Sequence, residues 1–337
     1  MYEIIRPLLF RLDPERAHTL TLRALQFTQV SPISAILHRI YGAPTKPVLV
    51  FGLEFPNPVG LAAGYDKDGQ AWRGLASLGF GHVEIGTVTL RPQPGNPKPR
   101  LFRLRAEEAL INRMGFPGRG AQYVADRLGG PRPPGLVLGV NMGKNKDTPL
   151  EDAAGDYQEL LRIFAPLGDY LVINVSSPNT VGLRRLQARN ALEELLQVLS
   201  EERGLQETRL KKSVPLLVKL SPDLQPDELE DALAVIDSKG MDGVIATNTT
   251  LSRDGIGATL AGESGGMSGR PLFKQSYSMV AQISLLTKGR LPVVGVGGIM
   301  GPAEARAMLE AGASLVQVYT GLVYKGPGLV KQILSGL

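Results

Sequence analysis

The spacing of hydrophobic positions changes near residue 45 of the chain. Before it, apolar residues recur every three or four positions, which is typical of amphipathic helices. Asp13-Pro14 and Ser31-Pro32 interrupt the pattern, and each joins a helix-capping residue to a proline suited to the first helical turn. The apolar faces comprise Ile4, Ile5, Leu8, Leu9 and Leu12, then Ala17, Leu20, Ala24 and Phe27, then Ile33, Ile36, Leu37 and Ile40. Residues 1–45 are therefore predicted to form a separate helical unit, either a hairpin packed on the main domain or an element lying on a membrane surface.

From Pro58 onward, short apolar runs alternate with helical stretches. Such runs are typical of parallel strands buried on both faces. The runs are 59–62, 83–87, 136–141, 171–175, 216–220, 243–247, 292–296 and 315–319, and helical patterns between them include 191–201, 226–238 and 302–311. Parallel strands need crossover helices and eight strands close a ring, so residues 46–337 are predicted to form a (β/α)8 TIM barrel. The rival fold, a doubly wound open sheet, would carry its glycine-rich phosphate turn after the first strand, whereas Gly295–Gly298 follows the seventh.

The segment from Leu90 to Pro117 interrupts the alternation of strands and helices. It contains five prolines between residues 92 and 117 and is too rich in proline for a helix. We predict an ordered excursion between the second and third strands, long enough to reach across the mouth of the barrel.

Composition excludes several kinds of chemistry. The chain of 337 residues has no cysteine, which rules out disulfides, thiolate metal sites and a cysteine nucleophile or acid. Three histidines, His18, His38 and His82, do not have metal-ligand spacing, so no metal is expected. The net charge is +5, but the basic residues are dispersed without a nucleic-acid motif. No apolar run is long enough for a transmembrane helix, and a signal peptide is not evident.

The residues just past the apolar runs are polar at nearly every strand, and in such barrels the active site lies at these ends. Gly297, Gly298 and Thr320 follow the last two strands, where barrels commonly bind a phosphate. Lys219 is a costly cation to bury unless it meets negative charge. Asn112, Asn174, Asn179 and Asn248 provide paired donors and acceptors that suit a flat, amide-like ring. The pattern favours a phosphate-bearing planar cofactor beside a small heterocycle.

Seven motifs together resemble a known family. They are G-L-A-A-G-Y-D-K-D-G at 60–69, I-G-T-V-T-L-R-P-Q-P-G-N-P-K-P-R-L-F-R-L at 85–104, I-N-R-M-G-F-P-G at 111–118, N-V-S-S-P-N-T at 174–180, A-T-N-T-T at 246–250, G-G-M-S-G-R-P-L at 265–272 and V-G-V-G-G-I at 294–299. In this order they are similar to the dihydroorotate dehydrogenases of class 2, which are membrane-associated and reduce quinones. The resemblance covers essentially the whole chain.

The resemblance implies an FMN enzyme of pyrimidine biosynthesis that oxidises (S)-dihydroorotate to orotate and reduces a lipid quinone. By motif match Ser177 takes the proton from substrate C5, and activity should rise with pH because a serine hydroxyl is a poor base. The implied substrate-binding residues are Lys67, Asn112, Arg113, Met114, Gly115, Phe116, Asn174, Asn179, Asn248 and Thr249. The implied cofactor-binding residues are Ala62, Ala63, Gly64, Thr87, Asn141, Asn174, Lys219, Thr247, Gly269, Gly298, Tyr319 and Thr320.

The resemblance also favours the membrane-surface interpretation of residues 1–45. It implies a quinone tunnel lined by His18 and Arg103, and a peripheral location on the cytoplasmic side of a bacterial inner membrane. We expect a monomer without nucleic-acid partners. Arg184 and Arg185 are interpreted as a solvated basic patch on a mobile lid.

Three alternatives keep the barrel or its ligand but change the function. One is another flavin barrel that reduces dihydropyrimidines or dihydrouridine, although those enzymes use a cysteine acid. A second is a phosphosugar isomerase or lyase without flavin, favoured by the phosphate signal alone. The third is a membrane-bound binding module that holds FMN without turnover.

Overall fold

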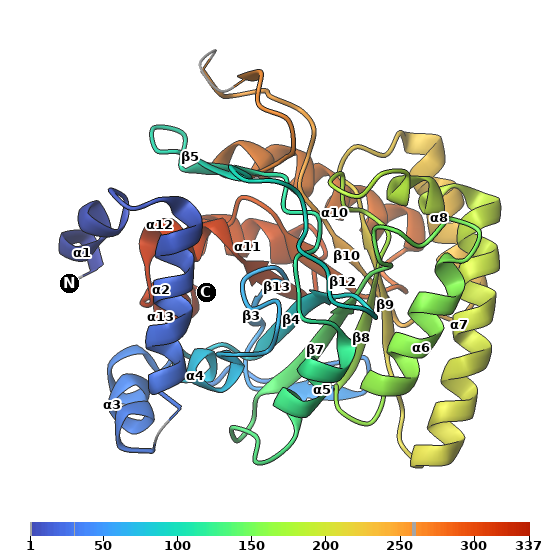
Figure 1. Cartoon of the computed structure of the whole chain (residues 1–337), viewed down its shortest axis with the longest axis horizontal. Helices are drawn as coiled ribbons and strands as arrows, with labels where there is room; N and C mark the ends of the chain where they lie inside the picture. Colours follow the sequence, from blue (N-terminus) through green and yellow to red (C-terminus); the bar gives the residue numbers. More distant parts are fainter. Residues whose placement is uncertain (1, 30, 258–260) are drawn as a thin grey trace.

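The main domain is a closed barrel of eight parallel strands (Figure 1). The computed structural model describes residues 2–29, 31–257 and 261–337. The barrel strands are β3 (Val59–Leu61), β4 (His82–Val88), β7 (Val137–Met142), β8 (Tyr170–Asn174), β9 (Leu216–Leu220), β10 (Gly243–Ala246), β12 (Val293–Val296) and β13 (Leu315–Val318). They pair in the order β10-β12-β13-β3-β4-β7-β8-β9. Each predicted strand coincides with one of these to within one residue at either end, so the predicted (β/α)8 barrel is confirmed.

Helices on the outside connect successive strands, and the last two helices follow β13 (Figure 1). They are α4 (Trp72–Ala76), α5 (Ala121–Leu128), α6 (Ala153–Phe164), α7 (Arg189–Leu210), α8 (Pro226–Ser238), α10 (Phe273–Thr287), α11 (Pro302–Glu310), α12 (Thr320–Lys325) and α13 (Leu329–Gly336). The sequence specifies the start of α8 locally, because Pro226 begins it and Glu228 accepts a hydrogen bond from the backbone N–H of Gln225 at 2.9 Å. The predicted helix at 191–201 lies within the longer α7, mostly in its N-terminal half.

A short hairpin closes the N-terminal end of the barrel. Strands β1 (Val48–Val50) and β2 (Leu53–Phe55) pair antiparallel, and the sequence analysis did not predict them. The hairpin packs against the barrel interior: Phe55 is fully buried, and a Cβ on Gly243 would lie 2.6 Å from the ring of Phe51. The hairpin therefore makes this end of the barrel a buried, packed core and leaves the opposite end for chemistry.

The proline-rich excursion forms part of a second sheet over the C-terminal end of the barrel. Strands β5 (Leu101–Leu104) and β6 (Ala109–Asn112) form a hairpin, and β11 (Gly266–Gly269) pairs antiparallel with β6. Figure 1 places β5 above the barrel strands. The excursion thus reaches the barrel mouth as expected, whereas its extension by β11 was not predicted.

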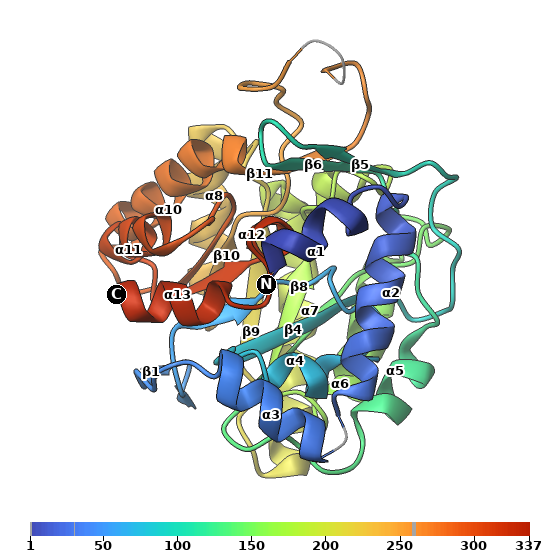
Figure 2. The same ribbon diagram turned by 90° about the vertical axis from the view of Figure 1, so that its left-hand side faces the viewer.

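The N-terminal segment forms helices α1 (Tyr2–Leu9), α2 (Pro14–Phe27) and α3 (Ser31–Tyr41) along one side of the barrel (Figure 2). The carboxylate of Asp13 caps α2 by accepting a hydrogen bond from the N–H of Arg16 at 3.0 Å. Several polar contacts anchor the helices, among them Arg6 Nη1 to the carbonyl of Tyr324 at 2.9 Å and the Arg100–Glu15 ion pair at 2.8 Å. Over the described ranges, none of the helices is long and apolar enough to cross a membrane.

His82, at the start of β4, is fully buried in the closed end of the barrel. Its ring packs edge-on against Phe55 at 5.4 Å and against Tyr170 at 6.3 Å between ring centroids. Within the described part of the chain neither ring nitrogen has a hydrogen-bond partner. Burial lowers the pKa of His82 to about 3, so the imidazole is neutral in the folded protein.

The buried imidazole predicts a loss of stability in acid. The unfolded chain binds a proton at His82 below its ordinary pKa of about 6.5, whereas the folded chain does not, so the free energy of unfolding falls as the pH drops below that value. Between pH 7 and pH 5 this group should cost about 2 kcal/mol. In denaturant unfolding at both pH values, His82→Phe should lose less stability than wild type by about that amount. The exposed His38→Phe should behave as wild type, and equal losses in all three proteins would contradict the account.

Candidate active site

One cavity lies at the C-terminal ends of the barrel strands, beneath the β5–β6–β11 sheet. It encloses about 1200 Å³, including the open solvent at its mouth. Its walls come from the ends of seven barrel strands and from the second sheet, which contributes Leu110, Asn112 and Ser268 among others. The side chains that follow the strands in sequence therefore share one space, as expected for a barrel active site.

A chain of amides runs along the floor of this cavity. Asn174, the last residue of β8, donates from Nδ2 to Thr87 Oγ1 at 2.9 Å and to Asn141 Oδ1 at 3.0 Å. Asn141 Nδ2 donates in turn to Glu84 Oε1 at 2.8 Å, and Asn248 Nδ2 donates to Asn174 Oδ1 at 3.2 Å. These bonds link residues of β4, β7 and β8 with the residue two positions after β10, so each amide has a fixed orientation.

Lys219 and Glu84 form a buried ion pair within the barrel. Their Nζ and Oε1 atoms are 3.8 Å apart, and the side chains are 6% and 0% exposed. Burial lowers the pKa of Lys219, and the carboxylate of Glu84 opposes that shift. Gln317 Nε2 donates to Glu84 Oε2 at 2.8 Å, but the buried Gln317 Oε1 has no partner among the described residues. Lys219 and Gln317 both line the cavity, so they present donor and acceptor groups to a ligand.

Ser177 lies in the loop that follows β8 and is 5% exposed. Its hydroxyl accepts a hydrogen bond from the N–H of Asn179 at 3.3 Å. Over the described ranges, no histidine, lysine or carboxylate contacts this hydroxyl through a hydrogen bond. The serine therefore faces the cavity without the neighbouring base that usually activates such a residue.

Polar groups also converge on the opposite wall, near the second sheet. Asn179 Nδ2 donates to Asn112 Oδ1 at 3.2 Å, which joins the serine loop to the end of β6. Lys67 donates from Nζ to the carbonyl of Gly64 at 2.7 Å. Burial lowers the pKa of Lys67 to about 8, opposed by the carboxylates of Asp68 and Glu15. Lys67 is thus a cation near neutral pH and can meet an anionic ligand.

Nearly all of the predicted substrate and cofactor residues line this one cavity. Those residues are Ala62, Ala63, Gly64, Lys67, Thr87, Asn112, Met114, Gly115, Phe116, Asn174, Ser177, Asn179, Lys219, Thr247, Asn248, Thr249, Gly269, Gly298, Tyr319 and Thr320. Asn141 lies behind the wall and orients Thr87 and Asn174. Arg113 is not among the lining residues: its side chain pairs with Glu263 at 2.7 Å and lies over the ring of Phe102, and its substrate contact stays a prediction.

A second, apolar cavity of about 1500 Å³, including the open solvent at its mouth, lies between the barrel and helices α1 to α3. His18 and Arg103, predicted to line a tunnel, are both in its wall. The two cavities share His18, Leu101, Leu110 and Tyr319 as lining residues. The ring of His18 packs edge-on against Tyr65 at 5.0 Å, and burial lowers the pKa of His18 to about 3. The second cavity therefore adjoins the first across a thin wall of side chains.

The sequence analysis missed several residues at the site. Glu84 and Gln317 are polar residues inside apolar runs, where burial of a polar side chain is costly. The same feature pointed to Lys219, so it could have identified both residues. Leu101, Leu110 and Ser268 had no such signal, because only the second sheet brings them over the barrel. Arg184 and Asp223 also belong to the surroundings of the site, as described below.

The fold and the site define a (β/α)8-barrel enzyme whose polar strand ends surround a single cavity with a buried cation. The family model described as dihydroorotate dehydrogenase matches residues 47–337. The chain is 52% identical to dihydroorotate dehydrogenase (quinone) of Acidithiobacillus ferrooxidans, over 100% of this chain and 94% of that protein. The corresponding protein of Idiomarina loihiensis is 48% identical, with 100% of both chains covered.

Solved structures agree. The crystal structure of DHODH in complex with ferulenol from Eimeria tenella superposes with a TM-score of 0.88 and is 37% identical, covering 96% of this chain and 90% of that one. The ligand-free enzyme from the same organism superposes with a TM-score of 0.87. The chain belongs to the dihydroorotate dehydrogenase family.

The buried pair predicts strong energetic coupling between Glu84 and Lys219. Removing one partner leaves an uncompensated charge in the barrel, which typically costs about 3–5 kcal/mol, whereas removing both avoids that penalty. We expect Glu84→Gln and Lys219→Met each to lower the free energy of unfolding, and the double variant to be more stable than the sum of the two losses implies. A double-mutant cycle by denaturant unfolding measures this coupling. Simple additivity would show that the two charges act independently.

Proposed function

We propose that this chain uses FMN to oxidise (S)-dihydroorotate to orotate at the ends of the barrel strands and passes the electrons to a lipid quinone. Dihydroorotate oxidation with a quinone acceptor, in pyrimidine biosynthesis, is the activity of the family to which the chain belongs. One observation carries the assignment of the site: a buried cation, Lys219, and an unassisted hydroxyl, Ser177, face the same cavity.

The residues around the cavity fit a flavin. The family is flavin-dependent in general. The glycines and Thr320 after the last two strands suit FMN, because its terminal phosphate needs backbone N–H donors at close range. The unpaired oxygen of Gln317 and the ammonium of Lys219 would meet the polar edge of the ring. A bound flavin would supply hydride acceptance and onward electron transfer. Lys219 would stabilise the negative charge that accompanies reduction.

The other cavity residues suit a flat anionic pyrimidine. Lys67 places its ammonium where it can bind the carboxylate of the substrate. Asn112, Asn179 and Asn248 offer amide groups to the ring. The hydrogen bond from Asn179 to Asn112 and the one from Asn248 Nδ2 to Ser176 Oγ fix which group faces the cavity. These side chains hold the substrate in one orientation, which lowers the barrier by removing rotational freedom before the reaction.

Ser177 removes the proton from C5 of the substrate. A hydroxyl has a high pKa and is a weak base, so it must release its own proton toward solvent as it receives the substrate's. At higher pH the solvent contains more hydroxide, which accepts that proton more readily. The rate of dihydroorotate oxidation should therefore rise with pH. The electron pair of the broken C5–H bond forms the ring double bond as hydride leaves C6.

Replacement of the serine tests this role. We expect Ser177→Ala to bind flavin normally but to be reduced by dihydroorotate about 10²- to 10⁴-fold more slowly, because the general base is lost. Ser177→Cys should retain more activity than Ser177→Ala, since a thiol ionises more readily. Anaerobic stopped-flow absorbance of the flavin measures both rates. A wild-type rate in Ser177→Ala would remove Ser177 from this role, and wild-type protein without flavin or without bleaching would refute the assigned reaction.

The second cavity is the proposed route of the quinone. Its walls are largely apolar, and it meets the first cavity at His18 and Tyr319, so a quinone ring placed there would approach the cofactor. On the outer side of the helices, large apolar side chains stay exposed, among them Ile4 (77%), Phe27 (73%) and Ile36 (59%). Such a surface is typical of a helical unit that lies in a membrane interface. We infer that residues 1–45 form this unit, on the cytoplasmic side of an inner membrane, while residues 46–337 form the catalytic barrel.

Narrowing the second cavity should impair quinone reduction alone. Ala24, on α2, lines that cavity, whereas its exposed neighbour Arg23 does not. We expect Ala24→Trp to raise the KM for a short-chain quinone about tenfold or to slow flavin reoxidation, because a bulky ring overfills the route. Flavin reduction by dihydroorotate should not change. Arg23→Trp is the matched control and should resemble wild type; equal quinone kinetics in both variants would place the route elsewhere.

A further inference from the structure

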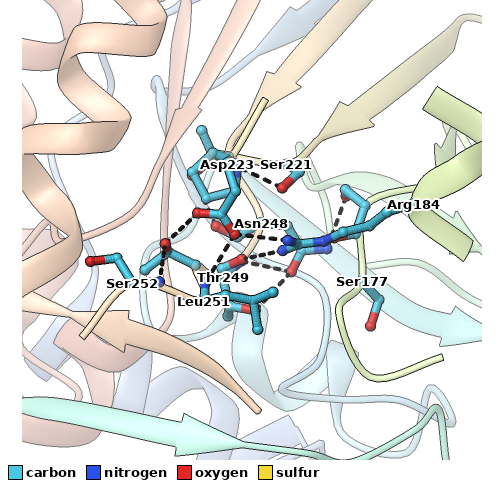
Figure 3. A network of polar contacts seen from close by, with 12 residues as sticks. Ser177, Arg184, Ser221, Asp223, Asn248, Thr249, Leu251 and Ser252 are labelled. Carbon is cyan, nitrogen blue, oxygen red and sulfur yellow. Dashed lines mark hydrogen bonds and ion pairs between the residues drawn. The ribbon is translucent and has the colours of Figure 1, made fainter. Parts of the chain in front are cut away.

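Arg184 is tied to three separate loops around the active site (Figure 3). It belongs to the short 3-10 helix Leu183–Gln187, which follows the serine loop. Nε donates to the carbonyl of Ser176 at 3.0 Å, Nη2 to the carbonyl of Thr249 at 2.9 Å, and Nη1 to Asp223 Oδ2 at 2.7 Å. The guanidinium therefore joins the loops that follow β8, β9 and β10.

Asp223 is the anionic partner of Arg184 in this network. Its carboxylate accepts hydrogen bonds from the N–H of Leu251 at 2.9 Å, from Gln275 Nε2 at 3.1 Å and from the hydroxyl of Thr250. Burial raises its pKa, but these hydrogen bonds and the charge of Arg184 outweigh that effect and hold the pKa below its ordinary value. Asp223 is thus an anion fixed from four directions, and Arg184 has a rigid partner.

The neighbouring Arg185 provides a contrast within the same helix. The side chain of Arg185 is exposed. Within the described part of the chain, this side chain makes no hydrogen bond or ion pair. Arg184 is 21% exposed and uses each of its three nitrogens. The interpretation of both residues as a solvated basic patch is therefore wrong for Arg184.

The two carbonyl groups that Arg184 binds lie next to reacting groups. The Ser176 carbonyl immediately precedes Ser177, the proposed base, and Thr249 lines the cavity beside Asn248, a proposed ligand of the substrate ring. A planar guanidinium fixes the relative position of groups that it binds along different edges. A shift of about 1 Å between a base and its substrate can slow a reaction about 100-fold. The geometry of this network is therefore suited to setting the distance between the base and the substrate.

We propose that the Arg184–Asp223 pair positions the loops of the site so that the Ser177 hydroxyl stays at the correct distance from the substrate ring. The proposal rests on the proposed function of Ser177 as the base. Arg184 and Asp223 do not line the cavity, so they act through the loops that they join and not by contact with the substrate. Without the pair, proton removal at C5 should slow while the cofactor and the quinone route stay intact.

The test uses flavin-loaded full-length protein with the variants Arg184→Ala, Asp223→Asn and the matched control Arg185→Ala. Anaerobic mixing with saturating dihydroorotate gives the rate constant and the amplitude of flavin reduction. A merely structural role would reduce flavin content or amplitude but leave the rate constant of the remaining active protein unchanged. We expect full amplitude with a rate constant about 10- to 100-fold lower in Arg184→Ala and Asp223→Asn, and a wild-type rate in Arg185→Ala.

Two further readouts distinguish positioning from general damage. Deuterium at C5 of the substrate should give a larger isotope effect in Arg184→Ala than in wild type, relative to deuterium at C6, because proton removal limits the rate. Guanidinium chloride at about 50 mM, far below denaturing concentrations, should restore part of the rate in Arg184→Ala by filling the partly exposed site. It should have no effect on Ser177→Ala.

A rate constant within twofold of wild type in flavin-loaded Arg184→Ala would overturn the proposal. If Arg184→Ala does not fold, Asp223→Asn serves as the test, because this substitution preserves the shape of the side chain. A wild-type rate constant in Asp223→Asn, or loss of its flavin, contradicts a positioning role. Ser177→Ala separates this failure from that of the proposed function. If Ser177→Ala is slow and Arg184→Ala is not, only the positioning role fails; if both are fast, the assignment of the base fails as well.

Discussion

The buried pair of Lys219 and Glu84 is the constraint on which the organisation of the site depends. A lysine inside a closed barrel is tolerated because a carboxylate lies 3.8 Å away and because that carboxylate is held by Asn141 and Gln317. The same hydrogen bonds fix the amide chain that forms the cavity floor. The charge that would otherwise destabilise the barrel is therefore available to a ligand at the strand ends.

The two ends of the barrel have different physical character. At the N-terminal end the β1–β2 hairpin and His82 form a buried core in which the two ring nitrogens of His82 have no hydrogen-bond partner among the described residues. At the C-terminal end the polar side chains meet beneath the β5–β6–β11 sheet, which limits access of solvent. The N-terminal helices add a second, apolar cavity beside the first. One chain thus has a polar cavity and an apolar cavity side by side, with Tyr319 in the wall of both.

Local sequence predicted the barrel well because each strand is a short apolar run that ends in polar or small residues. The parallel order requires no further information, since crossover helices allow few other closures. The β1–β2 hairpin and β11 were missed because they lie outside the apolar runs of the barrel rhythm, and β11 pairs with the distant β6. Motifs predicted the cavity residues, but could not indicate that Arg113 turns away toward Glu263. Motifs also could not show that Arg184 and Arg185 differ in role, because Asp223 lies beside Arg184 only in the folded protein.

The reduction potential of the bound flavin tests the central claim most directly. If Lys219 stabilises negative charge on the reduced cofactor, its removal must make reduction less favourable. We predict that Lys219→Met lowers the two-electron midpoint potential relative to wild type by about 30 mV for each 1.4 kcal/mol of lost stabilisation. Spectroelectrochemical titration of both proteins at neutral pH measures the difference. An unchanged or higher potential in Lys219→Met would contradict the account.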